Sequence, residues 1–217
     1  MRSHRTRLRS TLPACPTSTP TTASAFIDLG VVDALLAAGR TVVALDARGH
    51  GGSDAPHGVE RYSEERMARD LSQLADHLGL SQFDLLGFSM GAVVALLVAA
   101  TDRRLRRLVL TGLGASAVEQ GGVDTSALNV DALADAIEGV TPADQLDDST
   151  RGFLGYLHAR GLDPLAIASA ARARRRTPDL PFATMTQPTL LLIGESDQLA
   201  TRPEVLAAAG ASGRGDG

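Results

Sequence analysis

The stretch Gly87-Phe88-Ser89-Met90-Gly91 decides how this chain folds. A short apolar run at 83–86 precedes it, and a long apolar run at 92–100 follows it. This order predicts a strand, a tight turn carrying a serine, and a buried helix. A serine at such a turn takes a strained backbone conformation, and the residues two places to either side are expected to be small. Both are glycine, so the stretch is a G-x-S-x-G nucleophile elbow in the context that the motif requires.

Two features of this turn make Ser89 a candidate nucleophile. The backbone N–H of Met90 is expected to point to where an oxyanion would form, and the positive end of the following helix faces the same place. G-x-S-x-G also occurs by chance in chains rich in Gly and Ser. The interpretation therefore depends on the strand–turn–helix context and not on the five letters alone.

The segments before and after the turn predict an α/β fold. A helix is expected over 26–38, a buried strand over 41–45, and a helix that Ser63 caps and Gly79 ends. Further strands are expected at 106–112 and 189–194. Strands that alternate with helices indicate a doubly wound, mostly parallel sheet with helices on both faces.

Composition limits the classes of function. A length of 217 residues favours one domain, and no apolar run reaches the length of a membrane span. The net charge of -4 gives no reason to expect nucleic-acid binding. Cys15 is the single cysteine, so an intramolecular disulfide is impossible and a cytoplasmic location is expected. No metal or other cofactor is predicted, and the oligomeric state stays open.

A second motif carries a resemblance to a known family. Residues 46–54 read D-x-R-G-x-G-x-S-D after the strand expected at 41–45, and G-x-S-x-G follows one helix later. This combination resembles the α/β-hydrolase family. The resemblance implies that Ser89 attacks an ester or related acyl substrate, and that side chains of Arg48 and Ser53 hold backbone near the nucleophile turn. In the resembled pattern His50 is a loop residue and not the catalytic base.

The resemblance also implies a catalytic acid and a cap. Asp197 follows the strand expected at 189–194, where the family places its acid, and Glu195 is the alternative. Residues 116–183 resemble a helical cap, although they could be extra helices of the scaffold. The basic run at 172–176 is interpreted as a solvated helix end and not as an anion site. The domain prediction is an aberrant or disordered segment at 1–25, a core at 26–209 with its cap, and a disordered tail at 210–217.

The sequence departs from the family at both ends. No histidine follows Asp197, and no strand ending in His-Gly precedes residue 26. A truncated or frame-shifted hydrolase copy is therefore expected, with activity reduced by several orders of magnitude. Residues 1–25 alternatively resemble an organellar transit peptide. The alternative function is a non-catalytic relative that binds a ligand or a partner. Other chemistry on the same fold, such as lactone opening, also stays open.

Overall fold

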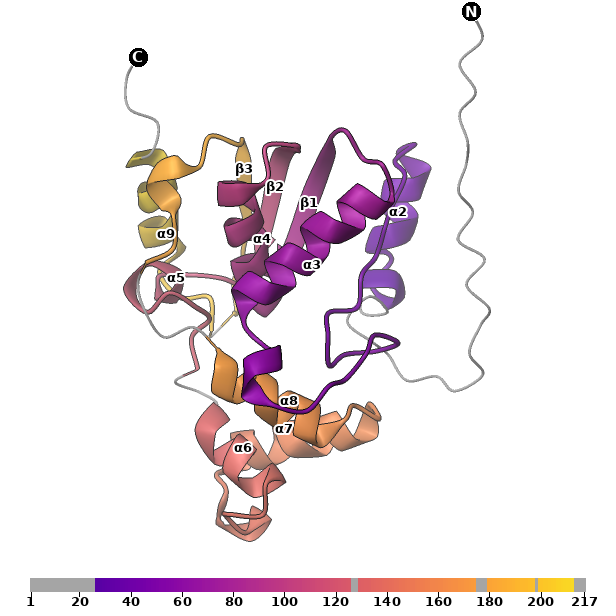
Figure 1. Ribbon diagram of the computed structural model, residues 1–217. Helices are drawn as coiled ribbons and strands as arrows, with labels where there is room; N and C mark the ends of the chain where they lie inside the picture. Colours follow the sequence, from indigo (N-terminus) through magenta and orange to yellow (C-terminus); the bar gives the residue numbers. More distant parts are fainter. Residues whose placement is uncertain (1–25, 126–128, 175–178, 198, 213–217) are drawn as a thin grey trace, which may run out of the picture.

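A three-stranded parallel sheet lies at the centre of the chain (Figure 1). The computed structural model describes residues 26–125, 129–174, 179–197 and 199–212. The strands are β1 (Phe83–Phe88), β2 (Leu105–Thr111) and β3 (Thr189–Leu192). They lie in the order β1-β2-β3, and both pairs are parallel, as the alternating pattern predicts.

The helices of the described residues are connected by loops and short 3-10 turns. In chain order they are α2 (Val31–Ala37), α3 (Glu64–His77), α4 (Met90–Thr101), α5 (Ser116–Glu119), α6 (Val130–Ile137), α7 (Asp148–Ala159), α8 (Pro164–Ala173) and α9 (Pro203–Ser212). The expected cap on α3 is confirmed, because the Ser63 hydroxyl accepts a hydrogen bond from the Arg66 N–H at 3.2 Å. Helix α9 includes residues 210–212, which the sequence had placed in the tail. None of these helices is long and apolar enough to cross a bilayer.

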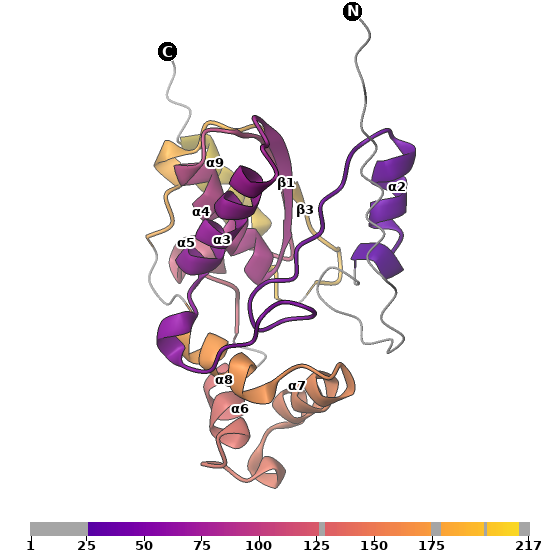
Figure 2. The same cartoon turned by 45° about the vertical axis from the view of Figure 1, so that its right-hand side comes forward.

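One face of the sheet carries the main core. Helices α3, α4 and α9 lie on the same side of the strands in Figure 2. Seven of the twelve residues of α4 are buried, which explains why its sequence is apolar on every side. Leu108 and Leu110 of β2 pack against this layer and are each 1% exposed.

The opposite face of the sheet is apolar and uncovered. Register places Phe88, Thr111 and Leu192 in one row across the strands. Phe88 and Leu192 are 56% and 58% exposed, and Leu190 is similarly exposed. Helix α2 stands on this side in Figure 2, but none of its residues is buried. The described part of the chain therefore leaves this face open to solvent.

The expected strand at 41–45 is not a strand in the structure. These residues pair with no neighbour in the sheet, and Val43 and Leu45 are exposed. A run rich in β-branched residues favours an extended strand, but a strand exists only where a second strand satisfies its backbone groups. The local pattern therefore predicted a strand for which the described residues contain no partner.

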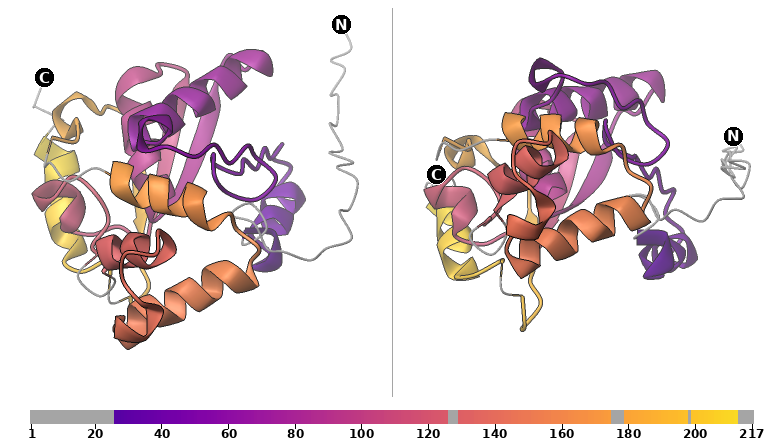
Figure 3. Two further views of the ribbon diagram at one scale, coloured as in Figure 1. Left: turned by 60° about the horizontal axis from the view of Figure 1, so that its bottom comes forward. Right: turned by 90° about the horizontal axis from the view of Figure 1, so that it is seen from below.

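Helices α6, α7 and α8 form a separate group at the carboxyl ends of the strands (Figures 1 and 3). Their apolar contacts form two small clusters, one around Leu133, Leu157 and Ile167 and the other around alanines of α6 and α8. Helix α8 also contacts the main core through Ala166. The group occupies the position where the sequence predicted a cap. The role of a cap over the active site stays a prediction, and the word cap is used below only as a label for α6–α8.

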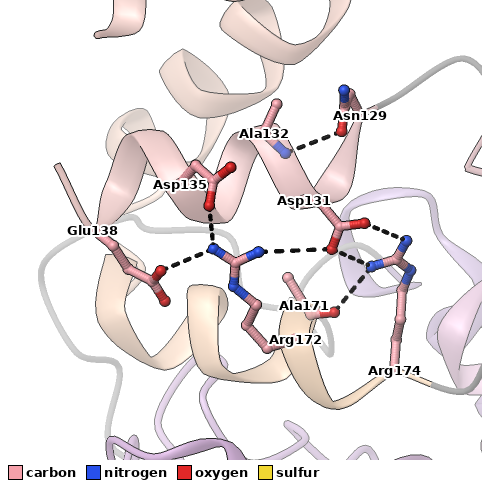
Figure 4. A network of polar contacts seen from close by, with 8 residues as sticks. All are labelled: Asn129, Asp131, Ala132, Asp135, Glu138, Ala171, Arg172 and Arg174. Carbon is pink, nitrogen blue, oxygen red and sulfur yellow. Dashed lines mark hydrogen bonds and ion pairs between the residues drawn. The ribbon is translucent and has the colours of Figure 1, made fainter. Parts of the chain in front are cut away.

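The basic run at the end of α8 pairs with acids of α6. Arg172 bonds to Asp135 and to Glu138, the latter at 2.9 Å, and Arg174 lies 3.2 Å from Asp131 (Figure 4). These two guanidinium groups thus hold two cap helices together, and they are neither a solvated end nor a free anion site. Residues 175 and 176 lie outside the described residues.

Candidate active site

The turn between β1 and α4 holds Ser89 in a strained conformation. Its φ and ψ are 52° and -122°, and it is one of two non-glycine residues with positive φ in the described chain. Its N–H donates to the Thr111 carbonyl on β2 at 2.9 Å, and its carbonyl accepts from the Ala92 N–H at 2.8 Å. Since such a conformation costs on the order of 1–3 kcal/mol, it persists only where surrounding contacts impose it. The strained serine expected from the sequence is confirmed.

The two glycines of the motif are not equivalent. A Cβ at Gly87 would lie 2.3 Å from the carbonyl oxygen of Gly91 and 2.8 Å from the Cα of Ala92. A Cβ at Gly91 would meet nothing within 4 Å. The expectation that both must be small is therefore right for Gly87 and wrong for Gly91. The collision is one-sided because Gly87 is on the strand and lies directly under the first turn of α4.

Met90 begins α4 directly after the serine. The first N–H groups of a helix have no partner within the helix, and they carry its positive partial charge. Ser89 and the first turn of α4 therefore lie next to each other, at the carboxyl edge of the sheet. A negatively charged oxygen bound there would meet the end of the helix that favours it.

Asp197 lies at the same edge of the sheet, beyond β3. Its N–H donates to the Gly194 carbonyl at 3.0 Å, and its Oδ1 accepts from the backbone N–H groups of Leu199 and Ala200 at 2.9 and 3.0 Å. Phe88 and Leu192, the last residues of their strands, are separated by β2 alone. Since neighbouring strands lie about 4.8 Å apart, these strand ends are about 10 Å apart. Ser89 follows Phe88 directly, and Asp197 lies five residues beyond Leu192.

Glu195, the alternative acid, is more exposed than Asp197. The backbone donors on Asp197 fix the orientation of its carboxylate, since a carboxyl group that accepts several N–H bonds is held in one rotamer. The Asp197 carboxylate is thus the better oriented of the two, and the choice of the catalytic acid stays a prediction.

The Arg-Gly loop is held chiefly by α3. Arg48 forms a two-pronged pair with Asp70, with distances of 2.7 and 2.6 Å, and it also donates to the Arg61 carbonyl at 2.8 Å. The hydrogen bond to Asp70 raises the pKa of Arg48. Ser53 donates to the Asp46 carbonyl at 2.6 Å. Both side chains do fix backbone, but it is the backbone of residues 46 and 61, and the sequence did not identify Asp70 as a partner.

His50 has its tautomer set within this loop. Its Nδ1 lies 3.1 Å from the Arg48 carbonyl, which can only accept, so Nδ1 carries the proton and Nε2 is the basic nitrogen. His57 lies 3.0 Å from Asp163 of the cap, and His77 and His158 lie on the last turns of α3 and α7. Among the described residues, no hydrogen bond joins an imidazole to the Ser89 hydroxyl.

The described residues contain no group of three or more His, Cys, Asp or Glu side chains that could hold a metal ion. The groups that the structure places at this edge of the sheet are a serine, the first turn of a helix and a carboxylate. Such a set can attack a carbonyl carbon and stabilise the resulting oxyanion once a base takes the serine proton.

Residues 20–128 match the family model described as the alpha/beta hydrolase fold. The chain belongs to the α/β-hydrolase fold family. The match begins before the described residues, includes the Arg-Gly loop and the Ser89 turn, and ends before the cap helices α6–α8. The fold class predicted from the sequence is thereby confirmed.

Individual relatives match short stretches of the chain. The chain is 43% identical to epoxide hydrolase 4 of Mus musculus over 58 residues, which is 27% of this chain and 16% of that protein. It is 38% identical to the 2-hydroxy-6-oxo-2,4-heptadienoate hydrolase of Pseudomonas putida over 87 residues, which is 39% of this chain and 31% of the relative. The alignments therefore span less than a third of each of these two hydrolases.

A solved structure extends the similarity over most of the fold. The structure of a hydrolase from Pseudomonas aeruginosa PA01 superposes with a TM-score of 0.58 and 27% identity. It covers 90% of this chain and 76% of that one. The structural similarity thus covers a larger share of this chain than either sequence alignment.

Proposed function

We propose that this chain is a serine hydrolase that acts on a carboxylic ester or a related acyl substrate. The observation that carries the proposal is Ser89, a non-glycine residue with a φ of 52° between the end of β1 and the first turn of α4. Strained conformations of this kind concentrate at active sites, where the surroundings impose them. Membership of a family whose cited relatives are hydrolases agrees with this assignment.

In the proposed reaction the Ser89 oxygen attacks the carbonyl carbon of the substrate while a base takes its proton. The negative charge that develops on the carbonyl oxygen is met by the Met90 N–H and the end of α4. The base then gives the proton to the leaving alcohol, and water releases the acyl group by the same two steps. Asp197 would orient the base and stabilise its positive charge.

The source of the base is the part of the proposal most open to test. No histidine occurs among residues 198–217, and the resembled family places its base after the catalytic acid and a further helix and strand. His50, whose Nε2 is the basic nitrogen, is the alternative within the Arg-Gly loop. Free imidazole can take the place of a side-chain base when the other groups are in position, so it provides a direct probe.

The test measures hydrolysis of an activated ester by the full chain with and without added imidazole. Ser89→Ala is the matched control, because imidazole also hydrolyses such esters in solution. A rate that rises with imidazole in the parent chain, beyond the rise in Ser89→Ala, supports the proposal. Covalent labelling of Ser89 by a serine-directed phosphonate gives a second reading.

Two results would redirect the proposal. Rapid hydrolysis without imidazole that is lost in His50→Gln would identify His50 as the base. No turnover and no labelling, together with a ligand that stabilises the fold, would instead support a non-catalytic binding protein. The observation that favours this second function is that no imidazole among the described residues is hydrogen-bonded to the Ser89 hydroxyl.

A further inference from the structure

The carboxyl end of β2 contacts both the serine turn and the loop that follows β3. Thr111, the last residue of β2, accepts a hydrogen bond from the Ser89 N–H at 2.9 Å. Four residues later, the Ala115 N–H donates to the Thr201 carbonyl in the loop after β3, also at 2.9 Å. The short segment 111–115 is therefore bonded to the serine turn at one end and to that loop at the other.

Gly114 is the place where this segment comes closest to the loop. A Cβ at Gly114 would lie 2.1 Å from the Thr201 carbonyl oxygen and 2.7 Å from the Ala200 carbonyl carbon. Both are backbone atoms, so neither can yield as the end of a flexible side chain can. Ala115 and Ala200, on the two sides of the contact, are 1% and 2% exposed. Only glycine lets the two backbones approach so closely in this buried place.

The same contact lies beside the groups that orient the Asp197 carboxylate. Asp197 Oδ1 accepts hydrogen bonds from the Leu199 and Ala200 N–H groups at 2.9 and 3.0 Å. A carboxylate that is held by charge-assisted bonds from backbone donors moves with that backbone. We call residues 197 and 199–202 the acid loop. The place of this loop against Gly114 therefore determines where the carboxylate lies.

A second contact fastens the far end of the acid loop to α5, the helix that follows the segment. Arg202 donates to both carboxylate oxygens of Glu119 on α5, at 2.8 and 2.5 Å. Helices α5 and α9 also contact each other (Figure 1). Arg202 has a φ of 48°, and it shares a positive φ with Ser89 alone among the described non-glycine residues. Such a conformation of a large side chain persists only where surrounding contacts impose it.

We propose that Gly114 is a positioning residue that fixes Asp197 relative to Ser89. The segment that contains Gly114 holds the serine turn by its first residue and the acid loop by its last two. We call Gly114, Ala115 and Glu119 the seat of the acid loop. In the proposed reaction Asp197 must meet the base that faces Ser89, and a displacement of about 1 Å can lower such a rate by about 100-fold. Only this effect on the rate rests on the proposed function.

Hydrogen exchange of the Leu199 and Ala200 amides tests the seat without any need for catalysis. In Gly114→Ala the new methyl must move the acid loop until the 2.1 Å separation exceeds 3.0 Å. The protection factors of both amides should fall by about tenfold or more, because hydrogen bonds to a charged group are lost. The Ser89 amide, which is bonded to Thr111 at the other end of the segment, should keep its protection.

Gly194→Ala is the matched control, because a Cβ at Gly194 would meet only the Asp197 Cβ, at an ordinary 3.8 Å. This variant should keep the protection of the acid-loop amides. Unchanged protection in Gly114→Ala, or an equal loss in Gly194→Ala, overturns the proposal.

Glu119→Gln tests the seat without adding a methyl group to a buried contact. Glu119 is exposed, so this variant should fold, and the protection of the acid-loop amides should fall by about two- to fivefold. If Gly114→Ala unfolds as a whole, so that the Ser89 amide also exchanges freely, this variant decides. Unchanged protection in Glu119→Gln then overturns the proposal.

Imidazole-dependent hydrolysis of the activated ester tests the consequence for catalysis. Asp197→Asn keeps an oxygen that accepts from the loop amides but loses the charge, so its rate should fall. Gly114→Ala should lower the rate by about tenfold or more, and combining it with Asp197→Asn should cause little further loss. Additive losses would mean that Gly114 acts by another route, and they overturn the positioning role. If no variant hydrolyses the ester while the exchange pattern holds, the proposed function fails and the seat is supported.

Discussion

Replacing the two glycines of the Ser89 motif by alanine, one at a time, should change the stability of the fold in opposite directions. In Gly87→Ala the new methyl would lie 2.3 Å from the Gly91 oxygen and 2.7 Å from the Gly91 carbonyl carbon. These are backbone atoms of the first turn of α4, so relief requires the helix to move relative to β1. Overpacking of this kind typically costs about 1–3 kcal/mol. We expect the upper half of that range, because no flexible side chain is available to yield.

Gly91→Ala is the matched control within the same motif. Its methyl meets nothing within 4 Å, and Gly91 lies in helical backbone without a positive φ. Alanine in place of glycine there should stabilise the chain by up to about 0.5–1 kcal/mol. The two variants should therefore differ by about 3 kcal/mol in free energy of unfolding, with Gly87→Ala the less stable.

Urea unfolding followed by circular dichroism measures this difference. In a chain of this size 1 kcal/mol moves the melting temperature by about 2–4 °C, so thermal melts should separate the variants by about 9 °C. Gly91→Ala should also keep phosphonate labelling of Ser89. Equal stability of the two variants, or a larger loss in Gly91→Ala, would refute the one-sided collision.

Three further outcomes follow from charges and exposure. The hydrogen bond from Arg104 lowers the pKa of the buried Asp102 to about 2. This pair therefore stabilises the fold above about pH 4 and loses that contribution as the pH falls toward 2. When the free energy of unfolding is measured over this pH range, Asp102→Asn should lose less stability than the parent chain. Arg172→Met should expose the α6–α8 join to protease, and proteolysis rates unchanged from the parent would contradict the role of its ion pairs. The double variant Leu190→Lys, Leu192→Lys should self-associate less than the parent chain in light scattering, because these leucines lie on the uncovered sheet face. A parent chain that is itself monodisperse would contradict this prediction.

The local sequence pattern predicted a segment correctly where the backbone N–H and C=O groups of that segment are hydrogen-bonded to residues close in sequence. The sequence by itself determined the strand–turn–helix around Ser89 and the helix that Ser63 caps, because hydrogen bonds inside a helix and at its cap join residues close in sequence. The sequence also determined that the sheet is parallel, because strands that alternate with helices are rarely arranged in any other way. The position of Asp197 beyond β3 followed from the same order of elements.

The tertiary structure alone decided what depends on residues far apart in the chain. Residues 41–45 have the composition of a strand, yet they are not one, because a strand needs a neighbour that composition cannot supply. Gly87 is obligatory and Gly91 is not, since only the packing of β1 under α4 distinguishes two identical letters. His57 and Asp163 are 106 residues apart and meet only because α8 docks against the segment 55–62. Contacts of this kind are set by the assembled fold, so no local pattern in the sequence could reveal them.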